Sequence, residues 1–242
     1  MKKLIPALAM LLLMLVLPGK SQGQILKNIF GGSSDPSSTE ISNGIKQALE
    51  VGTAASADRL SAQNGFFGNL AVKLLFPPEA QRAERTLRSI GLGKMCDNVI
   101  LSMNRAAEDA AKEAKPIFVS AIKQMTLNDA TGILLGADTA ATGYFKRTTR
   151  AQLAEKFSPI IEASLAKVGA TRYWSEMVNR YNRVPLVQKI NPDLKSYATQ
   201  KAIDGLFVEI AKEELKIREK IGARSTPLLQ KVFSYADKKK EE

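Results

Sequence analysis

The sequence predicts an all-α protein: a single bundle-like domain of about eight to ten helices, several of them short. Three observations support this class. Apolar residues recur every three or four positions through most of the chain after residue 38. Capping residues, glycines and prolines divide these stretches into lengths typical of helices. No stretch shows the sustained alternation of apolar and polar residues that marks a half-buried strand.

The first 23 residues have the layout of a secretory signal peptide. Two lysines precede an apolar run from Leu4 to Leu17, and Pro18 and a small-polar stretch follow. The run is shorter than the ~20 residues of a membrane-spanning helix. We expect cleavage before Gln24 and a mature protein that works outside the cytoplasm; an uncleaved N-terminal anchor is the alternative.

Three further segments are expected in the mature chain. Residues 24–38 are rich in Gly, Ser, Asp and Pro and predict a flexible linker. Residues 39–236 are the predicted helical domain. Residues 237–242, Asp-Lys-Lys-Lys-Glu-Glu, predict a disordered charged tail.

The first half of the domain divides into four predicted helices. One begins after a Ser38 or Thr39 cap and runs to about Leu60, and a short one over 80–90 ends at Gly91. The clearest stripe covers 92–114. Its second half is alanine-rich, which lets neighbouring helices approach closely, so we expect this helix to be central. Pro116 ends or kinks it, and 117–125 continue as a further helix.

The second half follows the same logic. Thr126 and Asp129 resemble a capping box for a helix through 135. Residues 136–139 open another helix toward 145, and 149–169 form a long segment with a kink near Pro159. Shorter predicted helices cover 173–181 and 227–233. Asn191-Pro192 predicts the start of a long helix that ends near 220.

Composition narrows the function. The chain has a net charge of +11 and no histidine. Without histidine, the Ser-His and Cys-His nucleophile pairs and the histidine-containing zinc sites are excluded. An exported basic protein meets anionic lipids and polymers rather than nucleic acid, and no aromatic-and-basic motif indicates nucleic-acid binding.

Few residues are candidates for chemistry. Ser120 and Lys123 match the S-x-x-K pattern of penicillin-recognising enzymes, but the K-T-G element is absent. Asp129 and Asp138 lack the spacing of a calcium loop and are interpreted as helix caps. Cys96 is interpreted as a buried apolar residue. We therefore predict no catalytic residue, no metal and no cofactor.

Glu214 is the most unusual carboxylate. It falls in the middle of the apolar stripe of its predicted helix, where an isolated charge is too costly to bury. We expect either a buried ion pair with an arginine such as Arg105, Arg147 or Arg150, or exposure beyond the core. The functional alternative is that Glu214 and these arginines read the polar head of a ligand.

A series of ordered motifs resembles the bacterial domain-of-unknown-function family 4197, whose members are exported proteins of Gram-negative bacteria. The resemblance extends over about 41–233 and implies an all-helical domain in the periplasm or envelope, without a reaction, cofactor or catalytic residue. The motifs are Met103-Asn104-Arg105-Ala106-Ala107-Glu108, Ala114-Lys115-Pro116, Gln124-Met125-Thr126-Leu127-Asn128-Asp129-Ala130, Gly132-Ile133-Leu134, Ala140-Ala141-Thr142-Gly143-Tyr144-Phe145, Ala202-Ile203-Asp204-Gly205-Leu206-Phe207, Glu213-Glu214, Ile217-Arg218 and Leu228-Leu229-Gln230-Lys231-Val232-Phe233.

Three functions are compatible with these observations. The first is a non-enzymatic periplasmic protein of the envelope that binds a protein partner or an anionic surface. The second is a carrier of a lipid-like or other hydrophobic molecule in an inter-helix cavity. The third, which the missing histidines disfavour, is an enzyme that works without that residue.

Overall fold

The computed structural model describes residues 35–183, 185–186, 189–191 and 193–242. The predicted signal peptide at 1–23 and most of the predicted linker at 24–38 lie outside the described residues. Residues 36–242 form one compact unit. The all-α prediction is confirmed: the described residues form nine α-helices and two short 3-10 turns, without a strand.

The domain begins with α2 (Ser38–Ser61), the 3-10 turn η1 (Pro78–Ala80) and α3 (Gln81–Ser89). The N-cap of α2 is Ser37 rather than the predicted Ser38 or Thr39. Its hydroxyl accepts from the amide of Glu40 at 3.2 Å, and the Glu40 carboxylate accepts from the Ser37 amide at 2.9 Å. This reciprocal capping box fixes the start of the domain.

Next come α4 (Gly93–Ala111) and α5 (Ala114–Gln124). The alanines in the second half of α4 are fully buried, and α4 packs against α2, α7 and α9, so the predicted central position is confirmed. Pro116 is the third residue of α5. It is tolerated there because the first-turn amides of a helix have no partner within the helix.

The following helices are α6 (Leu127–Leu135) and α7 (Ala140–Lys167). The Thr126 and Asp129 capping box is present, as predicted. The two helices expected over 136–145 and 149–169 are a single continuous helix, and Pro159 lies inside it. Phe157 and Ile161 are completely buried on either side of Pro159, so packing holds the helix together where one backbone hydrogen bond is missing.

The chain finishes with α8 (Ala170–Tyr181), α9 (Leu194–Glu219), the 3-10 turn η2 (Ile221–Ala223) and α10 (Pro227–Glu241). The cap of α9 is Asp193, which accepts from the amide of Ser196 at 2.9 Å, rather than the predicted Asn191.

The prediction of a disordered tail at 237–242 needs correction, because α10 extends through Glu241. Its last turns are tied down by two ion pairs. Asp237 accepts from Arg224 at 2.7 Å, and Lys240 donates to Asp138 at 3.0 Å.

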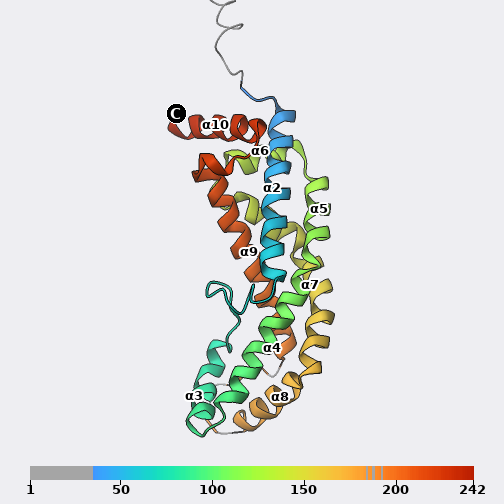
Figure 1. Cartoon of the computed structure of the whole chain (residues 1–242), viewed down its shortest axis with the longest axis vertical. Coiled ribbons are helices and arrows are strands. Elements are labelled where there is room, and N and C mark those ends of the chain that lie inside the picture. Colours follow the sequence, from blue (N-terminus) through green and yellow to red (C-terminus); the bar gives the residue numbers. More distant parts are fainter. Residues whose placement is uncertain (1–34, 184, 187–188, 192) are drawn as a thin grey trace, which may run out of the picture. The chain divides into compact units, whose positions relative to one another are not determined.

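Figure 1 shows how these elements are arranged in the described domain. Helices α2, α4, α7 and α9 pack side by side, and α6 and α10 pack together at one end. Helices α3 and α8 lie at the opposite end, where both pack on α4. None of the helices in the described ranges combines the length and the apolar character needed to cross a membrane.

Candidate functional site

The sequence singled out Glu214, and the structure places its side chain in the core with 5% of its surface exposed. One carboxylate oxygen accepts from the amide of Ala141 at 2.9 Å. The other accepts from the amide and hydroxyl of Thr142 at 2.9 and 2.8 Å. These amides belong to the first turn of α7, whose own N-cap residue, Thr139, makes no side-chain cap. Glu214 therefore caps α7 from α9, with its negative charge at the positive end of the helix dipole.

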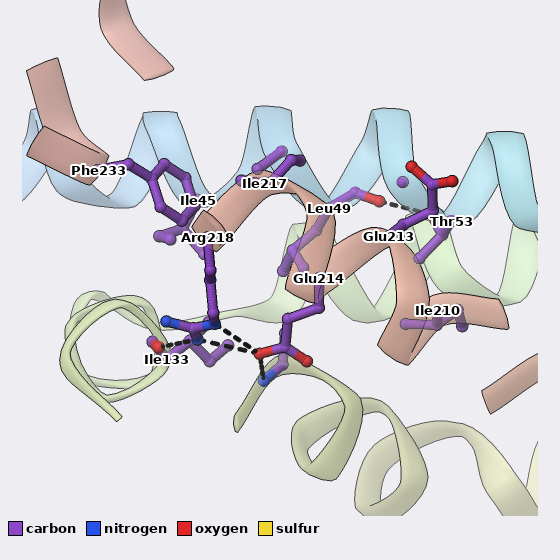
Figure 2. A pocket seen from close by; sticks show the side chains of 13 residues that line it. Ile45, Leu49, Thr53, Ile133, Ile210, Glu213, Glu214, Ile217, Arg218 and Phe233 are labelled. Atoms are coloured by element: carbon purple, nitrogen blue, oxygen red, sulfur yellow. Dashed lines mark hydrogen bonds and ion pairs between the residues drawn. The ribbon is translucent and has the colours of Figure 1, made fainter. Parts of the chain in front are cut away.

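Arg218, one turn further along α9, completes this arrangement. Its Nη2 and Nε donate to the Oε1 of Glu214 at 2.9 and 3.2 Å (Figure 2). Its guanidinium also donates to the carbonyls of Ile133 at 2.7 Å and Leu134 at 3.2 Å. These are among the last carbonyls of α6. The pair thus joins the end of α6 and the start of α7 to α9.

The expected buried ion pair of Glu214 is present, but its partner is Arg218 rather than Arg105, Arg147 or Arg150. Arg105 pairs with Glu108 on α4. Arg150 pairs with Asp204 at 2.8 Å, and Arg147 lies 5.7 Å from the ring centre of Tyr144. The structure brings none of these three arginines into contact with Glu214, so the four candidate ligand-binding residues do not form one site.

The cavity beside Glu214 is small. It has a volume of about 30 Å³, which is room for roughly two water molecules. The carboxylate already accepts five hydrogen bonds, and a carboxylate has only about four lone-pair sites. This cavity does not fit a lipid, and the geometry of Glu214 is that of a structural group. The lining residues come from α2, α6, α7, α9 and α10 (Figure 2).

Other buried polar side chains also hold backbone. Glu108 accepts from the amides of Phe66 and Phe67 at 3.1 Å each. Asn104 accepts from the amide of Leu74 at 2.9 Å and donates to its carbonyl at 2.8 Å. Both side chains come from α4. Together they fix the long non-helical segment between α2 and η1.

Two further buried charges stabilise α9: Glu209, which lies on α9 and bonds to side chains, and Arg224, which follows η2 and bonds to the backbone of α9. Burial opposes ionisation of Glu209, but hydrogen bonds from Lys212 and Asn69 outweigh it and lower the pKa of this carboxyl. Arg224 donates to the carbonyls of Ile217 at 3.1 Å and Arg218 at 2.7 Å, which closes the last turn of α9.

The Ser120 and Lys123 pattern forms no catalytic pair. Lys123 is exposed on α5, and the hydroxyl of Ser120 accepts from Gln124 at 3.2 Å. The geometry offers no activated nucleophile at this position.

A larger hollow lies between α3, the start of α4 and α8. We call it the α3–α8 groove. It has a volume of about 630 Å³, well within the ~300–1,000 Å³ of small-molecule sites. Most of its surface is apolar or aromatic, and Arg82 and Glu176 are its charged residues. The groove is lined by Arg82, Ala83, Thr86, Leu87, Leu92, Met95, Tyr173, Glu176, Met177 and Tyr181.

The surface around the groove combines exposed apolar side chains with cations. Ile90, Leu92 and Tyr173 are 66%, 41% and 43% exposed. Four exposed cations on the same helices, Arg82, Arg85, Lys94 and Arg172, have no carboxylate within ion-pair distance among the described residues. Arg88 differs, because it pairs with Glu84 and Asp97 at 2.8 Å each.

Behind the groove lies a small cavity of about 10 Å³, lined in part by Trp174 and Cys96. The side chains of Met95, Tyr173 and Met177 line both hollows and so separate them. The Nε1 of Trp174 is buried and has no hydrogen-bond partner in the described part of the chain. Burial raises the pKa of the Cys96 thiol.

Sequence reasoning missed the α3–α8 groove. The residues of α8 were visible as a run of Tyr173, Trp174, Met177 and Tyr181, but this spacing is equally typical of a core-facing stripe. Only Trp174 of these four is fully buried. Methionine side chains are flexible and adapt to different neighbours. Met177 in this run, together with Met95 on an earlier predicted helix, is the signal that could have indicated an adaptable surface.

Comparison with known proteins gives one positive result. A family model described as "Protein of unknown function (DUF4197)" matches residues 35–234. No curated protein and no solved structure matches the chain.

Proposed function

This chain belongs to the DUF4197 family, and we propose that it is an exported, non-enzymatic protein of the cell envelope that binds an anionic lipid surface. The proposed contact is the end of the domain formed by α3, the start of α4 and α8. We call this region the basic apolar end; its surface residues are Arg82, Arg85, Ile90, Leu92, Lys94, Arg172 and Tyr173.

One observation carries the proposal: exposed apolar side chains and cations without carboxylate partners lie together on α3, on the start of α4, on α8 and in the turn between α3 and α4. Ile90 and Leu92 flank Gly91 in the turn between α3 and α4, where two apolar side chains project from a short connection. Exposed apolar groups surrounded by cations are typical of proteins that lie on a membrane interface.

The physical chemistry favours an anionic surface. Each Lys or Arg held near an anionic membrane contributes about 1 kcal/mol at physiological ionic strength. Four cations without carboxylate partners therefore contribute about 4 kcal/mol together, and insertion of Ile90 and Leu92 adds the burial of their apolar area. The net charge, +11 for the whole chain and 32 − 24 = +8 without Lys2, Lys3 and Lys20 of the leader, acts in the same direction at longer range.

The non-enzymatic part of the proposal is supported by the use of the buried charges. Glu108, Glu214, Arg218 and Arg224 all bond to backbone groups or to each other. Such groups hold helices and loops in place and are not poised for proton transfer. The export part is supported by the signal-peptide layout of residues 1–23.

The test is co-sedimentation with lipid vesicles. Residues 24–242 are used, because they contain the whole compact unit 36–242 without the apolar run of the leader. We expect binding to vesicles that contain phosphatidylglycerol, little binding to pure phosphatidylcholine, and a loss of binding as salt rises.

Matched variants locate the contact. The double variant Ile90→Ser/Leu92→Ser should bind anionic vesicles at least tenfold more weakly. The control, Val119→Ser/Leu127→Ser, changes two exposed apolar residues on α5 and α6 and should bind normally. Equal binding to both lipids, or equal loss in both double variants, would reject the proposal and leave a protein partner as the ligand to seek.

A further inference from the structure

We propose that the α3–α8 groove holds the single acyl chain of an anionic amphiphile, a fatty acid or a lysophospholipid, with the anionic head beside Arg82. This inference rests on the proposed function and deepens it, since it assigns a ligand to the same end of the domain.

The lining of the groove suits an acyl chain. Ala83 and Leu87 come from α3, Leu92 and Met95 from the start of α4, and Met177 from α8. Methionine side chains are flexible and polarisable, so they adapt to chains of different length and unsaturation. A preformed hollow of about 630 Å³ with few polar groups is typical of a site for a largely apolar ligand.

The groove is connected to the surface where such a ligand would come from. Leu92 and Tyr173 line the groove and are also partly exposed at the basic apolar end. An acyl chain that leaves a bilayer at this contact meets the groove without crossing water. This shared wall favours a lipid chain over an apolar ligand that arrives from solution.

The charged residues of the groove determine which charge the ligand's head carries and where the head lies. Arg82 is exposed, lines the groove and has no carboxylate within ion-pair distance among the described residues, whereas neighbouring Arg88 is neutralised by Glu84 and Asp97. A guanidinium without a carboxylate partner attracts a carboxylate or phosphate group. Glu176 is the carboxylate in the lining and repels an anion, so the head belongs at Arg82. The two residues therefore predict effects of opposite sign.

The chain provides its own reporter of binding. Trp174 is the single tryptophan, and the cavity that it lines shares Met95, Tyr173 and Met177 with the groove. A chain that enters the groove moves these side chains and changes the fluorescence of Trp174. The probes are lysophosphatidylglycerol and fatty acids of 8 to 14 carbons, used below the concentrations at which they form micelles, with dodecyl maltoside as the uncharged amphiphile.

The expected results are specific. Each two-carbon extension should tighten binding about tenfold or more until the groove is full, because each buried CH₂ contributes about fourfold. Arg82→Gln should weaken binding of both anionic probes about threefold to tenfold, and Glu176→Gln should tighten it. A preference for lysophosphatidylglycerol over the fatty acids identifies a phospholipid as the source, and the reverse identifies a free fatty acid.

A steric variant and a matched control complete the test. Thr86→Phe places a ring in the groove, while Thr148→Phe is the control on α7. Both threonines are exposed and donate to the carbonyl four residues earlier, at 3.1 and 2.9 Å. Thr86→Phe should lose monomeric ligand, and Thr148→Phe should bind it normally. If Thr86→Phe fails to fold by circular dichroism, the opposite effects of Arg82→Gln and Glu176→Gln decide.

The outcomes separate this inference from the proposed function. Absence of chain-length dependence, or wild-type binding by folded Thr86→Phe, overturns the acyl site even if anionic vesicles bind. Binding of monomeric amphiphiles without binding to vesicles supports the acyl site and overturns the surface contact.

Discussion

Arg218 and Glu214 lie one turn apart on α9 and meet at 2.9 Å, each with its remaining hydrogen bonds directed at a different helix end. Glu214 bonds to the start of α7 and Arg218 to the end of α6. A charge at each helix end is thus matched by an opposite charge from α9. The role of the pair is therefore to stabilise the packing of α6, α7 and α9, and not to take part in a reaction.

The first prediction concerns this pair. Glu214→Gln leaves the guanidinium of Arg218 buried without its counter-charge, so the free energy of unfolding should fall by about 3–5 kcal/mol. Urea denaturation followed by circular dichroism measures it. Arg150→Ala is the control, because its pair with Asp204 is about half exposed and should be worth no more than about 1 kcal/mol. A loss from Glu214→Gln as small as the control's would contradict the structural role.

The second prediction concerns the segment between α2 and η1. Asn104→Ala removes both hydrogen bonds to the backbone of Leu74, and each buried backbone group left without a partner costs about 1–3 kcal/mol. The segment should become sensitive to limited proteolysis while the helices stay protected. Ser102→Ala, on the same helix, removes only a hydroxyl bonded to the carbonyl of Asn98 and should leave the digestion pattern unchanged.

The third prediction concerns acid stability. Hydrogen bonds from Lys231 and Ser37 lower the pKa of Glu40 to about 2, and the pKa of Glu209 is lowered as well. Because these folded-state values lie below the ordinary 4.5, the folded chain binds fewer protons than the unfolded chain. The stability that the two carboxylates supply is complete above about pH 4.5 and is lost as the pH falls toward 2.

Urea midpoints measured from pH 7 to pH 2 check this behaviour. The double variant Glu40→Gln/Glu209→Gln should be less stable than wild type at pH 7, and the difference should shrink as the pH falls. Glu155→Gln, exposed on α7, is the control. A difference in stability that stays constant down to pH 2 would show that the two carboxylates are not the source of the pH-dependent stability.

The fourth prediction concerns Cys96, which is 1% exposed and lines the cavity behind the groove. Burial raises the pKa of its thiol and blocks access, so little reactive thiolate is available. A thiol reagent should not react with the folded chain at pH 7.5 and should label one thiol per chain in denaturant. Rapid labelling of folded protein would mean that the cavity opens to solvent.

The periodicity of apolar residues was sufficient to predict the helical class and the central position of α4. For Glu214 it left two possibilities, a buried ion pair and exposure, and the structure shows the buried ion pair. Continuity across 145–149 was not predictable, because Thr149 is a residue type that also begins helices. In α7 its side chain is instead buried and its hydroxyl donates to the carbonyl of Phe145 at 2.7 Å. Charge composition alone predicted disorder at 237–242, while the ion pairs of Asp237 and Lys240 depend on residues far away in the sequence.

The candidate sites, too, depend on contacts between residues that lie far apart in the sequence. That Glu214 needs a partner follows from its position in an apolar stripe, but the choice of Arg218 depends on where α6 ends and α7 begins. The α3–α8 groove depends on the approach of α3 and α8, which are about 80 residues apart in sequence. A single sequence contains no direct record of such a contact.

Hydrogen–deuterium exchange with and without phosphatidylglycerol vesicles tests the central claim most directly, because it locates the surface that the lipid covers. We predict added protection in residues 82–95 and 170–183, and unchanged exchange in α6 and α10 at the opposite end of the domain (Figure 1). Protection centred on α6 and α10, or no added protection while the protein is bound to vesicles, would contradict the account.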